Sequence, residues 1–366
     1  MKLPFPHSKT RPGPAHAFRT PRAGGAARRL APVLIGCCGF CWAGIVPPLR
    51  AQTLKVWNSK LPPPAEPGEV VGAALGSGHM LVVRRDGTVT GSGMNVVSGI
   101  PVPVSTITAG MSGVVAVAAG YDHSLVLKSD GTVTAWGPNR ASGESTVPAG
   151  LTGVVAIAAG DIHSLALKED GTVAAWGYHC RVPAGLCGVV AIAADGVTSA
   201  ALKSDGTLVF WSEDYDQYHM SSPPVIPTGV TAVAAGAWHA LALKSDGTVT
   251  AWGGNFYGEC QVPAGLAGVV EVATGANYSL ALKSDRTLAV WGNAGDIPAA
   301  GVPEVAAVSA NKHGTVALLS TPGRPPAILG SMRALATGGY GSFRYRIATA
   351  SPAVSFAAAG LPPGLA

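Results

Sequence analysis

A histidine leads a fifteen-residue segment that this sequence repeats with few changes. The segment reads HSLALKEDGTVAAWG at 163–177, and it returns as HSLVLKSDGTVTAWG at 123–137 and as HALALKSDGTVTAWG at 239–253. Histidine is a frequent general acid or base and the commonest metal ligand, because imidazole titrates near neutral pH. The repetition therefore raises two hypotheses: a chemical site assembled from several histidines, or a structural unit used many times.

The spacing of the histidines favours the structural hypothesis. The histidine position recurs at a mean interval of 39 residues, at His79, His123, His163, Thr198, His239, Tyr278 and His313. Thr198 and Tyr278 keep a polar group but are not equivalent bases or ligands. Metal ligands must also converge within about 2–2.6 Å of one ion, which positions spread around a ring do not do. We expect a half-buried side chain that hydrogen-bonds within its own repeat.

Other residues with chemical potential have similar structural explanations. The repeated Asp precedes Gly in a turn, so turn chemistry explains it without calcium. The tryptophans share one register and are expected to pack between repeats rather than to form a ligand cage, at Trp57, Trp136, Trp176, Trp211, Trp252 and Trp291. No G-x-S-x-G, H-E-x-x-H, Walker or dinucleotide-binding motif is present. We predict no catalytic residue, no metal and no cofactor, with a hydrolase or lyase site built from loops as the alternative.

The repeat has the local pattern of short β-strands. VVAIAA at 154–159 predicts a strand of small residues, and 164–168 alternates in the two-residue period of a second strand. Asp170-Gly171 then predicts a two-residue hairpin turn, and 172–176 predicts the return strand. At Asp285-Arg286 the glycine is missing, so this turn is expected to be strained or of another type.

The count of the two hairpin strands predicts how the fold closes. The HSLALK strand occurs seven times, whereas the TVxAWG strand follows only the first six copies. The missing strand has its match at the other end of the chain, where TLKVWN at 53–58 resembles TLVFWS at 207–212. We therefore predict an all-β, seven-bladed β-propeller in which residues 53–58 complete the last blade and lock the ring.

The repeat also resembles a known family. Its pattern G-x-x-H-S-L-A-L-K-x-D-G-x-V-x-x-W-G is similar to the repeat of the regulator of chromosome condensation family. The short period and the connector in GNFYGECQVPAGL, 253–265, resemble bacterial short-repeat forms, which include the type II β-lactamase inhibitory protein. The resemblance covers about residues 53–320. It implies a seven-bladed propeller and, as alternatives for function, β-lactamase inhibition or nucleotide exchange on a small GTPase.

The N-terminal 51 residues look like an export signal. They hold eight of the 25 Lys and Arg residues and no Asp or Glu, and an apolar run follows Arg28-Arg29. We predict a signal peptide over 1–51 and a mature protein that is secreted or held at the cell envelope, with no later membrane span. Lipidation at Cys37 and a single membrane anchor stay open.

The remaining composition bears on partners and on redox state. Residues 52–366 hold 17 basic against 20 acidic residues, which disfavours a nucleic-acid partner and exchange on a GTPase. Cys180 and Cys187 could close a small loop in an oxidising compartment, which leaves Cys260 unpaired. A monomer is expected.

The propeller is predicted to span 52–320, and the last 46 residues have a different character. Residues 321–366 resemble the first half of a bacterial immunoglobulin-like domain, up to its G-L-P-x-G-L signature. A complete domain of that kind has about 100 residues. We expect a partial immunoglobulin-like domain.

Variation among the copies points to a binding surface. It gathers in the residue pair before the histidine and in the loop after the Trp-Gly strand. Exposed aromatic and polar residues there are the candidate binding residues: Tyr121, Asp122, Tyr178, Tyr215, Tyr218, Trp238, Phe256 and Tyr257. A rigid ring with variable loops is typical of a binding platform, so we expect a non-enzymatic module that binds a protein or a surface glycan.

Overall fold

The computed structural model describes residues 53–64, 70–97, 100–139, 143–178, 180–212, 229–298, 302 and 304–319. All of them belong to one compact unit, Pro32–Ala366. The predicted signal peptide (1–51), the immunoglobulin-like segment (321–366), Tyr215 and Tyr218 lie outside the described residues.

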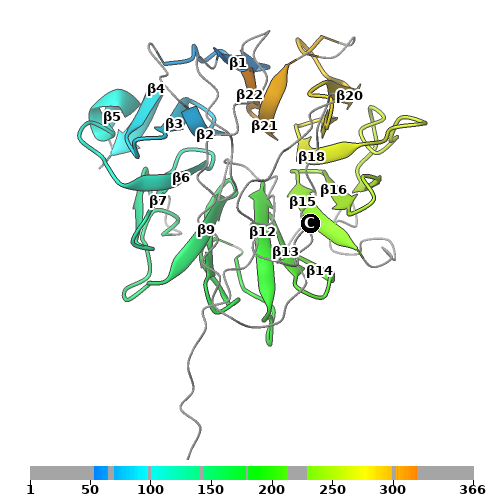
Figure 1. The fold of residues 1–366 in the computed structure, drawn as a ribbon. Coiled ribbons are helices and arrows are strands. Elements are labelled where there is room, and N and C mark those ends of the chain that lie inside the picture. The colour runs from blue at the N-terminus through cyan, green and yellow to red at the C-terminus, as the bar shows by residue number, and fades with distance from the viewer. Residues whose placement is uncertain are drawn as a thin grey trace, which may run out of the picture. The chain divides into compact units, whose positions relative to one another are not determined.

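The described strands form seven antiparallel sheets that follow one another around a ring (Figure 1). We number these sheets as blades 1 to 7 in chain order. Their strands are β2 (Val70–Leu75), β3 (His79–Arg84), β4 (Val89–Val97) and β5 (Ile100–Pro103) in blade 1; β6 (Val114–Ala119), β7 (Ser124–Lys128) and β8 (Val133–Trp136) in blade 2; β9 (Val154–Ala159), β10 (His163–Lys168) and β11 (Val173–Gly177) in blade 3; β12 (Val189–Asp195), β13 (Thr198–Lys203) and β14 (Leu208–Trp211) in blade 4; β15 (Val230–Ala235), β16 (His239–Lys244) and β17 (Val249–Gly253) in blade 5; β18 (Val269–Thr274), β19 (Tyr278–Lys283) and β20 (Leu288–Gly292) in blade 6; and β21 (Val305–Asn311), β22 (Gly314–Leu319) and β1 (Thr53–Trp57) in blade 7. The predicted all-β propeller of seven blades is confirmed.

Blade 7 joins the two ends of the propeller. Its strand order is β1-β22-β21, and Leu54 of β1 lies opposite Leu318 of β22 in antiparallel register. Leu54 is 5% exposed, so the first strand also contributes to the core. The predicted closure by residues 53–58 is therefore confirmed, and it pairs an edge of β22 that would otherwise be open.

The hairpin turns differ from the predicted two-residue type. In blade 3 the amide of Gly171 donates to the carbonyl of Lys168, and the amide of Lys168 donates to the carbonyl of Thr172, both at 2.9 Å. The loop therefore has three residues, with positive φ only at Gly171, 78°. Asp170 Oδ1 accepts bonds from the amide and the hydroxyl of Thr172, at 2.9 and 2.5 Å. The aspartate thus closes the turn itself.

The turn that lacks glycine keeps the same geometry. Arg286 has φ 68°, close to the 78° of Gly171, and its amide donates to the carbonyl of Lys283 at 2.9 Å. A side chain in this left-handed region costs about 1–2 kcal/mol. Of the two predicted outcomes, strain is the correct one.

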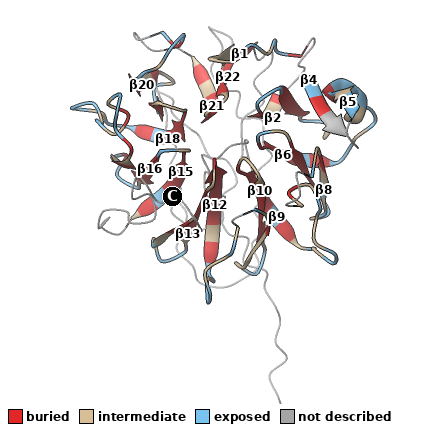
Figure 2. Cartoon of the chain, turned by 180° about the vertical axis from the view of Figure 1, so that it is seen from behind, coloured by how far each residue is buried: buried red, intermediate tan, exposed pale blue. Residues whose placement is uncertain are grey.

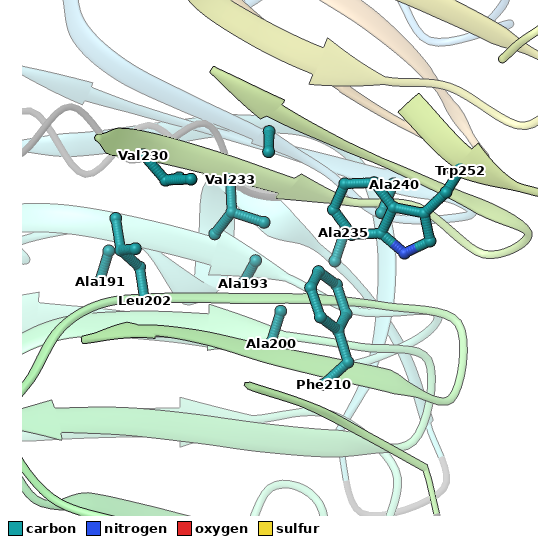
Figure 3. Packing of buried hydrophobic residues seen from close by; sticks show 11 residues of the cluster. Ala191, Ala193, Ala200, Leu202, Phe210, Val230, Val233, Ala235, Ala240 and Trp252 are labelled. Carbon is teal, nitrogen blue, oxygen red and sulfur yellow. The ribbon is translucent and has the colours of Figure 1, made fainter. Parts of the chain in front are cut away.

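Each tryptophan of the repeat packs against the preceding blade. Trp252 of blade 5 lies in one cluster with Phe210, Ala191 and Val233, and its ring meets Phe210 edge-on at 5.1 Å (Figure 3). Trp136, Trp176, Trp211 and Trp291 are equally buried at the corresponding interfaces. The predicted role in packing between blades is confirmed.

Burial follows the strands and ends at the turns (Figure 2). The first strand of each blade is rich in Ala and Val, as in VVAIAA of β9, and these small side chains let neighbouring blades approach closely. The one helix among the described residues, α1 (Val104–Ile107), has four residues. No helix in this part of the chain is long and apolar enough to cross a membrane.

Candidate functional site

Two sets of loops lie on the same face of the propeller. The axial loops connect the first and second strands of the blades, at 76–78, 120–123, 160–162, 196–197, 236–238, 275–277 and 312–313. The outer loops follow the third strand of a blade. Backbone bonds join the two sets, from the Tyr178 amide to the Ile162 carbonyl at 2.9 Å and from the Gly254 amide to the Trp238 carbonyl at 2.7 Å. We name this surface the loop face and the side with the Asp-Gly turns the turn face.

The candidate aromatic residues that the structure describes lie on the loop face. Tyr121 and Trp238 belong to axial loops and Tyr178, Phe256 and Tyr257 to outer loops, with exposed fractions of 41%, 40%, 47%, 73% and 56%. Among the described residues, these five are the aromatic side chains that are exposed. Asp122 is half-buried and accepts a bond from the Ser77 hydroxyl at 3.3 Å.

The outer loop of blade 5 has a fixed backbone. The buried Glu259 carboxylate accepts the amides of Phe256 and Tyr257, at 3.3 and 2.7 Å. The Glu259 carbonyl accepts bonds from the Ser279 hydroxyl and the Trp291 indole of blade 6, at 2.7 and 2.8 Å. Phe256 and Tyr257 are therefore presented on a loop that is tied to two blades, which lowers the entropy lost on binding.

The repeated histidines join one blade to the next. Nε2 of His123 lies 3.0 Å from Oγ of Ser164, and Nε2 of His239 lies 2.9 Å from Oγ of Ser279. Ser164 donates its own proton to the Glu144 carbonyl at 2.9 Å, so His123 is the donor in this pair. These histidines are fully buried and bond between blades. The prediction of a half-buried side chain that bonds within its repeat was wrong on both points.

Burial keeps these imidazoles neutral. Loss of hydration is the main cause that lowers the pKa of His79, His123 and His239 to about 4. A neutral imidazole can donate from one nitrogen, which is the role that Ser164 and Ser279 require, because each hydroxyl donates its own proton to a carbonyl. The histidines are therefore hydrogen-bonding parts of the blade interfaces.

Where the imidazole is absent, its serine partner is absent too. Blade 4 has Thr198 at the histidine position, and the facing residue in blade 5 is Ala240. In blade 7 the pairing of Thr315 with Ala310 places Gly314 at the histidine position, and blade 1 has Met80 at the serine position. The predicted register at His313 was therefore wrong by one residue. Because the histidine and the facing serine are absent together, no serine hydroxyl at the facing position is buried without a hydrogen-bond partner at these interfaces.

A third position changes together with this pair. A Cβ on Gly160 would lie 2.1 Å from Cε1 of His163, so glycine is needed where an imidazole follows. The equivalent positions in blades 4 and 7, where the imidazole is missing, hold Asp195 and Asn311. Two blades thus place polar side chains close to the axis where the others have glycine.

These changes create a cluster of charged and aromatic groups that crosses the ring, which we name the axial cluster. It contains Tyr121, Asp161, Asp195, Lys312 and His313 from four blades. Lys312 of blade 7 forms an ion pair with Asp161 of blade 3, and its Nζ lies 5.4 Å from the centre of the Tyr121 ring. His313 meets Tyr121 edge-on at 5.3 Å. Tyr121 is thus the only predicted binding residue in the cluster.

The charges in the axial cluster influence one another. The pKa of Asp195 is raised to about 7, mainly by burial and in part by the negative Asp161, while Lys312 acts against this rise. Burial and the nearby Lys312 lower the pKa of His313. Sequence reasoning missed Asp161, Asp195 and Lys312. The signal for Asp195, and for Lys312 beside Asn311, was the loss of glycine three residues before positions 198 and 314, whereas Asp161 lies in the variable pair before its histidine.

Two further predictions concern the cysteines and metals. No disulfide joins Cys180 and Cys187, and the Sγ atoms of Cys180 and Cys260 approach the carbonyls of Gly177 and Gly254 at 3.3 and 3.1 Å. Within the described ranges, no three His, Cys, Asp or Glu side chains converge as metal ligands.

Comparison with known proteins agrees with the repeat. The model of the regulator of chromosome condensation (RCC1) repeat matches residues 114–142, 154–181 and 230–259, in blades 2, 3 and 5. The chain therefore contains RCC1-type repeats over these residues. A search of curated proteins gives no match.

Several solved structures share the fold. Prp20p from Saccharomyces cerevisiae has a TM-score of 0.60 at 19% identity, covering 76% of this chain and 93% of Prp20p. Yeast RCC1 (Prp20) bound to Kap60 has a TM-score of 0.59 at 18% identity, covering 83% and 96%. The ectodomain of the receptor kinase CR4 from Physcomitrella patens has 0.54 at 23%, covering 68% and 70%. At these identities the similarity supports a common fold. The function must be argued from the candidate site of this chain.

Proposed function

We propose that this chain is an exported, non-enzymatic RCC1-like propeller that binds a protein partner through its loop face. One observation carries the proposal: the five exposed aromatic side chains of the described residues all lie on that face. Exposed aromatic residues on a pre-formed backbone are the usual anchors of protein interfaces. The leader-like composition of residues 1–51 supports export.

Similar structures support a protein partner. Prp20p was studied for its binding to Gsp1p and histones, and yeast RCC1 was crystallised with Kap60. We transfer only the kind of ligand, a folded protein, because the identity is below 20%. A surface glycan stays the second candidate, since exposed tyrosine and tryptophan rings also stack on sugars.

A capture experiment with matched variants tests the proposal. The full chain would be immobilised and exposed to secreted and envelope fractions of its source organism. We expect one partner in near-stoichiometric amount, retained by Val155→Ala and lost from the Trp238→Ala/Tyr257→Ala double variant. Val155 is 45% exposed, and it lies beside the Asp-Gly turn of blade 2, so it controls for exposed apolar area on the turn face.

The outcomes separate the candidates. A partner that all variants retain contradicts the assignment to the loop face. Capture of no protein at micromolar concentration contradicts a protein partner, and a glycan array with the same variants then tests the second candidate. A β-lactamase is one specific partner to examine, because the repeat resembles that of the type II β-lactamase inhibitory protein. The presence of aromatic residues in the pair before the histidine only at Tyr121 and Trp238 speaks against it. Unchanged nitrocefin hydrolysis at micromolar protein would exclude it.

A further inference from the structure

The axial cluster has more negative than positive groups. Asp122, Asp161 and Asp195 lie in or beside it, and Lys312 is the cation that pairs with Asp161. Asp195 is 3% exposed, and its Oδ1 accepts its neighbour's amide, Gly196, at 2.8 Å. Its Oδ2 is buried without a hydrogen-bond partner. A buried polar oxygen without a partner is costly, so the hydrogen-bonding capacity of the cluster is not fully used within the chain.

The groups around the Lys312 ammonium are those that bind alkylammonium ions. Asp161 supplies a carboxylate, and the Tyr121 ring stands 5.4 Å from Nζ, within the range of a cation–π contact. The site opens to solvent on the loop face, since the side chains of Lys312 and Asp161 are 24% and 20% exposed. Lys312 itself reaches the cluster on a flexible four-carbon stem from a short axial loop, so it can leave without a change of the blades.

We propose that the axial cluster is a recognition site for an alkylammonium group and that Lys312 fills this site from within the chain. An external ammonium takes the place of the Lys312 ammonium beside Asp161 and under the Tyr121 ring. A lysine side chain of a protein and a free alkylamine share this chemistry. The site shares Tyr121 with the proposed partner surface, but it does not use Trp238 or Tyr257, the two residues that the capture experiment changes.

The first test removes the internal occupant from the full chain. In Lys312→Ala, n-butylammonium chloride is expected to bind at least about tenfold more tightly than in the native chain, because a tethered competitor acts at millimolar effective concentration or above. Calorimetric titration measures this binding, and thermal unfolding measures the accompanying rise in Tm. n-Butanol has the alkyl chain of butylammonium without its charge, and sodium chloride supplies a cation without the alkyl chain. Neither compound should produce either effect.

Two further variants make the test specific. Asp161→Asn in the Lys312→Ala background should abolish the butylammonium response. Lys168→Ala removes a lysine that pairs with Asp170 at 3.1 Å on the turn face, and it should leave the response as weak as in the native chain. If Lys312→Ala loses stability but responds alike to butylammonium and butanol, Lys312 is only a brace across the ring and the proposal is wrong.

The proposal can still be tested if Lys312→Ala fails to fold. Lys312→Met keeps the length of the stem and is the second choice. If neither variant folds, the native chain labelled with ¹³C-lysine decides. Butylammonium, but not butanol, must then shift the Lys312 Cε resonance, and an unchanged resonance overturns the proposal.

A last comparison identifies the source of the ammonium. The peptide Gly-Gly-Lys-Gly-Gly and its acetyl-lysine counterpart would be titrated into Lys312→Ala. Binding of the lysine form alone supports a protein side chain, whereas binding of butylammonium without either peptide supports a free amine. The Trp238→Ala/Tyr257→Ala variant should keep the butylammonium response, so failure of the partner surface and failure of this site are distinguishable.

Discussion

His163 and Ser199 belong to successive blades, and Nε2 of the first lies 2.9 Å from Oγ of the second. The same bond joins blades 1 and 2, 2 and 3, and 5 and 6, and the Tyr278 hydroxyl meets Thr315 at 2.7 Å between blades 6 and 7. The Thr198 and Ala240 pair shows that an interface can also lack both groups. The two members are therefore expected to be energetically coupled.

A double-mutant cycle measures this coupling. Ser199→Ala leaves the buried His163 imidazole without its partner and should lower the free energy of unfolding by about 1–3 kcal/mol. The His163→Thr/Ser199→Ala variant copies the interface of blades 4 and 5. It should be more stable than the sum of the single changes predicts, by about 1 kcal/mol, in chemical denaturation.

Ser204→Ala is the control for this cycle. Ser204 is exposed in a turn, so its removal should change stability by less than about 0.5 kcal/mol. Strict additivity of the His163 and Ser199 changes would show that the bond contributes nothing specific to the interface.

Acid should weaken the propeller through its buried histidines. The pKa of His239 is about 4 in the folded chain, lowered by burial from 6.5, so the unfolded chain takes up the proton first as pH falls. The stabilising contribution is complete above pH 6.5 and is lost as pH falls toward 4. Each such histidine contributes about 1.4 kcal/mol per pH unit within that window. His79 and His123 have the same lowered value.

Two buried carboxyl groups act in the opposite direction. Burial raises the pKa of Asp195 to about 7 and that of Glu271 to about 8, so their contributions are lost as pH rises through those values. The histidine effect is isolated by comparing the native chain with His239→Gln. Between pH 4.5 and 6, the variant's free energy of unfolding should depend on pH less steeply, by about 1.4 kcal/mol per unit. An equal slope would mean that His239 is charged in the folded chain.

The local signals in the sequence were sufficient to predict the blades. The Ala- and Val-rich first strand, the alternation in HSLALK and the Asp-Gly turn each specify a strand or a turn over a few residues. Closure by residues 53–58 followed from counting strands. The second strand of the blade occurs seven times, so the closed ring needs seven third strands, and the seventh is found at 53–58. At blade 7 the same method failed, since the histidine in NKHGTV is displaced by one residue and only the strand pairing reveals Gly314 as the equivalent.

The axial cluster could not be predicted from local pattern. Asp161 and Lys312 are 151 residues apart, and they meet only because the ring brings blades 3 and 7 to a common axis. The sequence shows that Asp195 and Asn311 depart from the repeat. It does not show which residues of other blades their side chains meet. Exposed aromatic residues in variable loops were easier to predict, since their exposure depends on position within one repeat.

A reciprocal swap tests the strain at the turn without glycine. Arg286→Gly should raise Tm and stabilise the chain by up to about 1 kcal/mol, because glycine adopts φ 68° without steric strain. The loss of the half-buried Arg286–Glu304 pair, 3.6 Å apart, offsets only part of this gain. Gly171→Ala in the regular turn should cost about 1–2 kcal/mol. Destabilisation by Arg286→Gly would show that the arginine side chain outweighs the backbone strain.

Closure of the ring is tested at two adjacent residues of β1. Leu54 faces the core and Lys55 faces solvent, so the same new charge has different surroundings at the two positions. Leu54→Asp should lower the free energy of unfolding by more than about 3 kcal/mol, because it replaces apolar packing with a buried charge. It should also cause aggregation at micromolar concentration, measured by light scattering, as the edge of β22 is uncovered. Lys55→Asp should stay within about 0.5 kcal/mol of the native chain. Equal, small effects of both changes would contradict a propeller whose ring depends on its first strand.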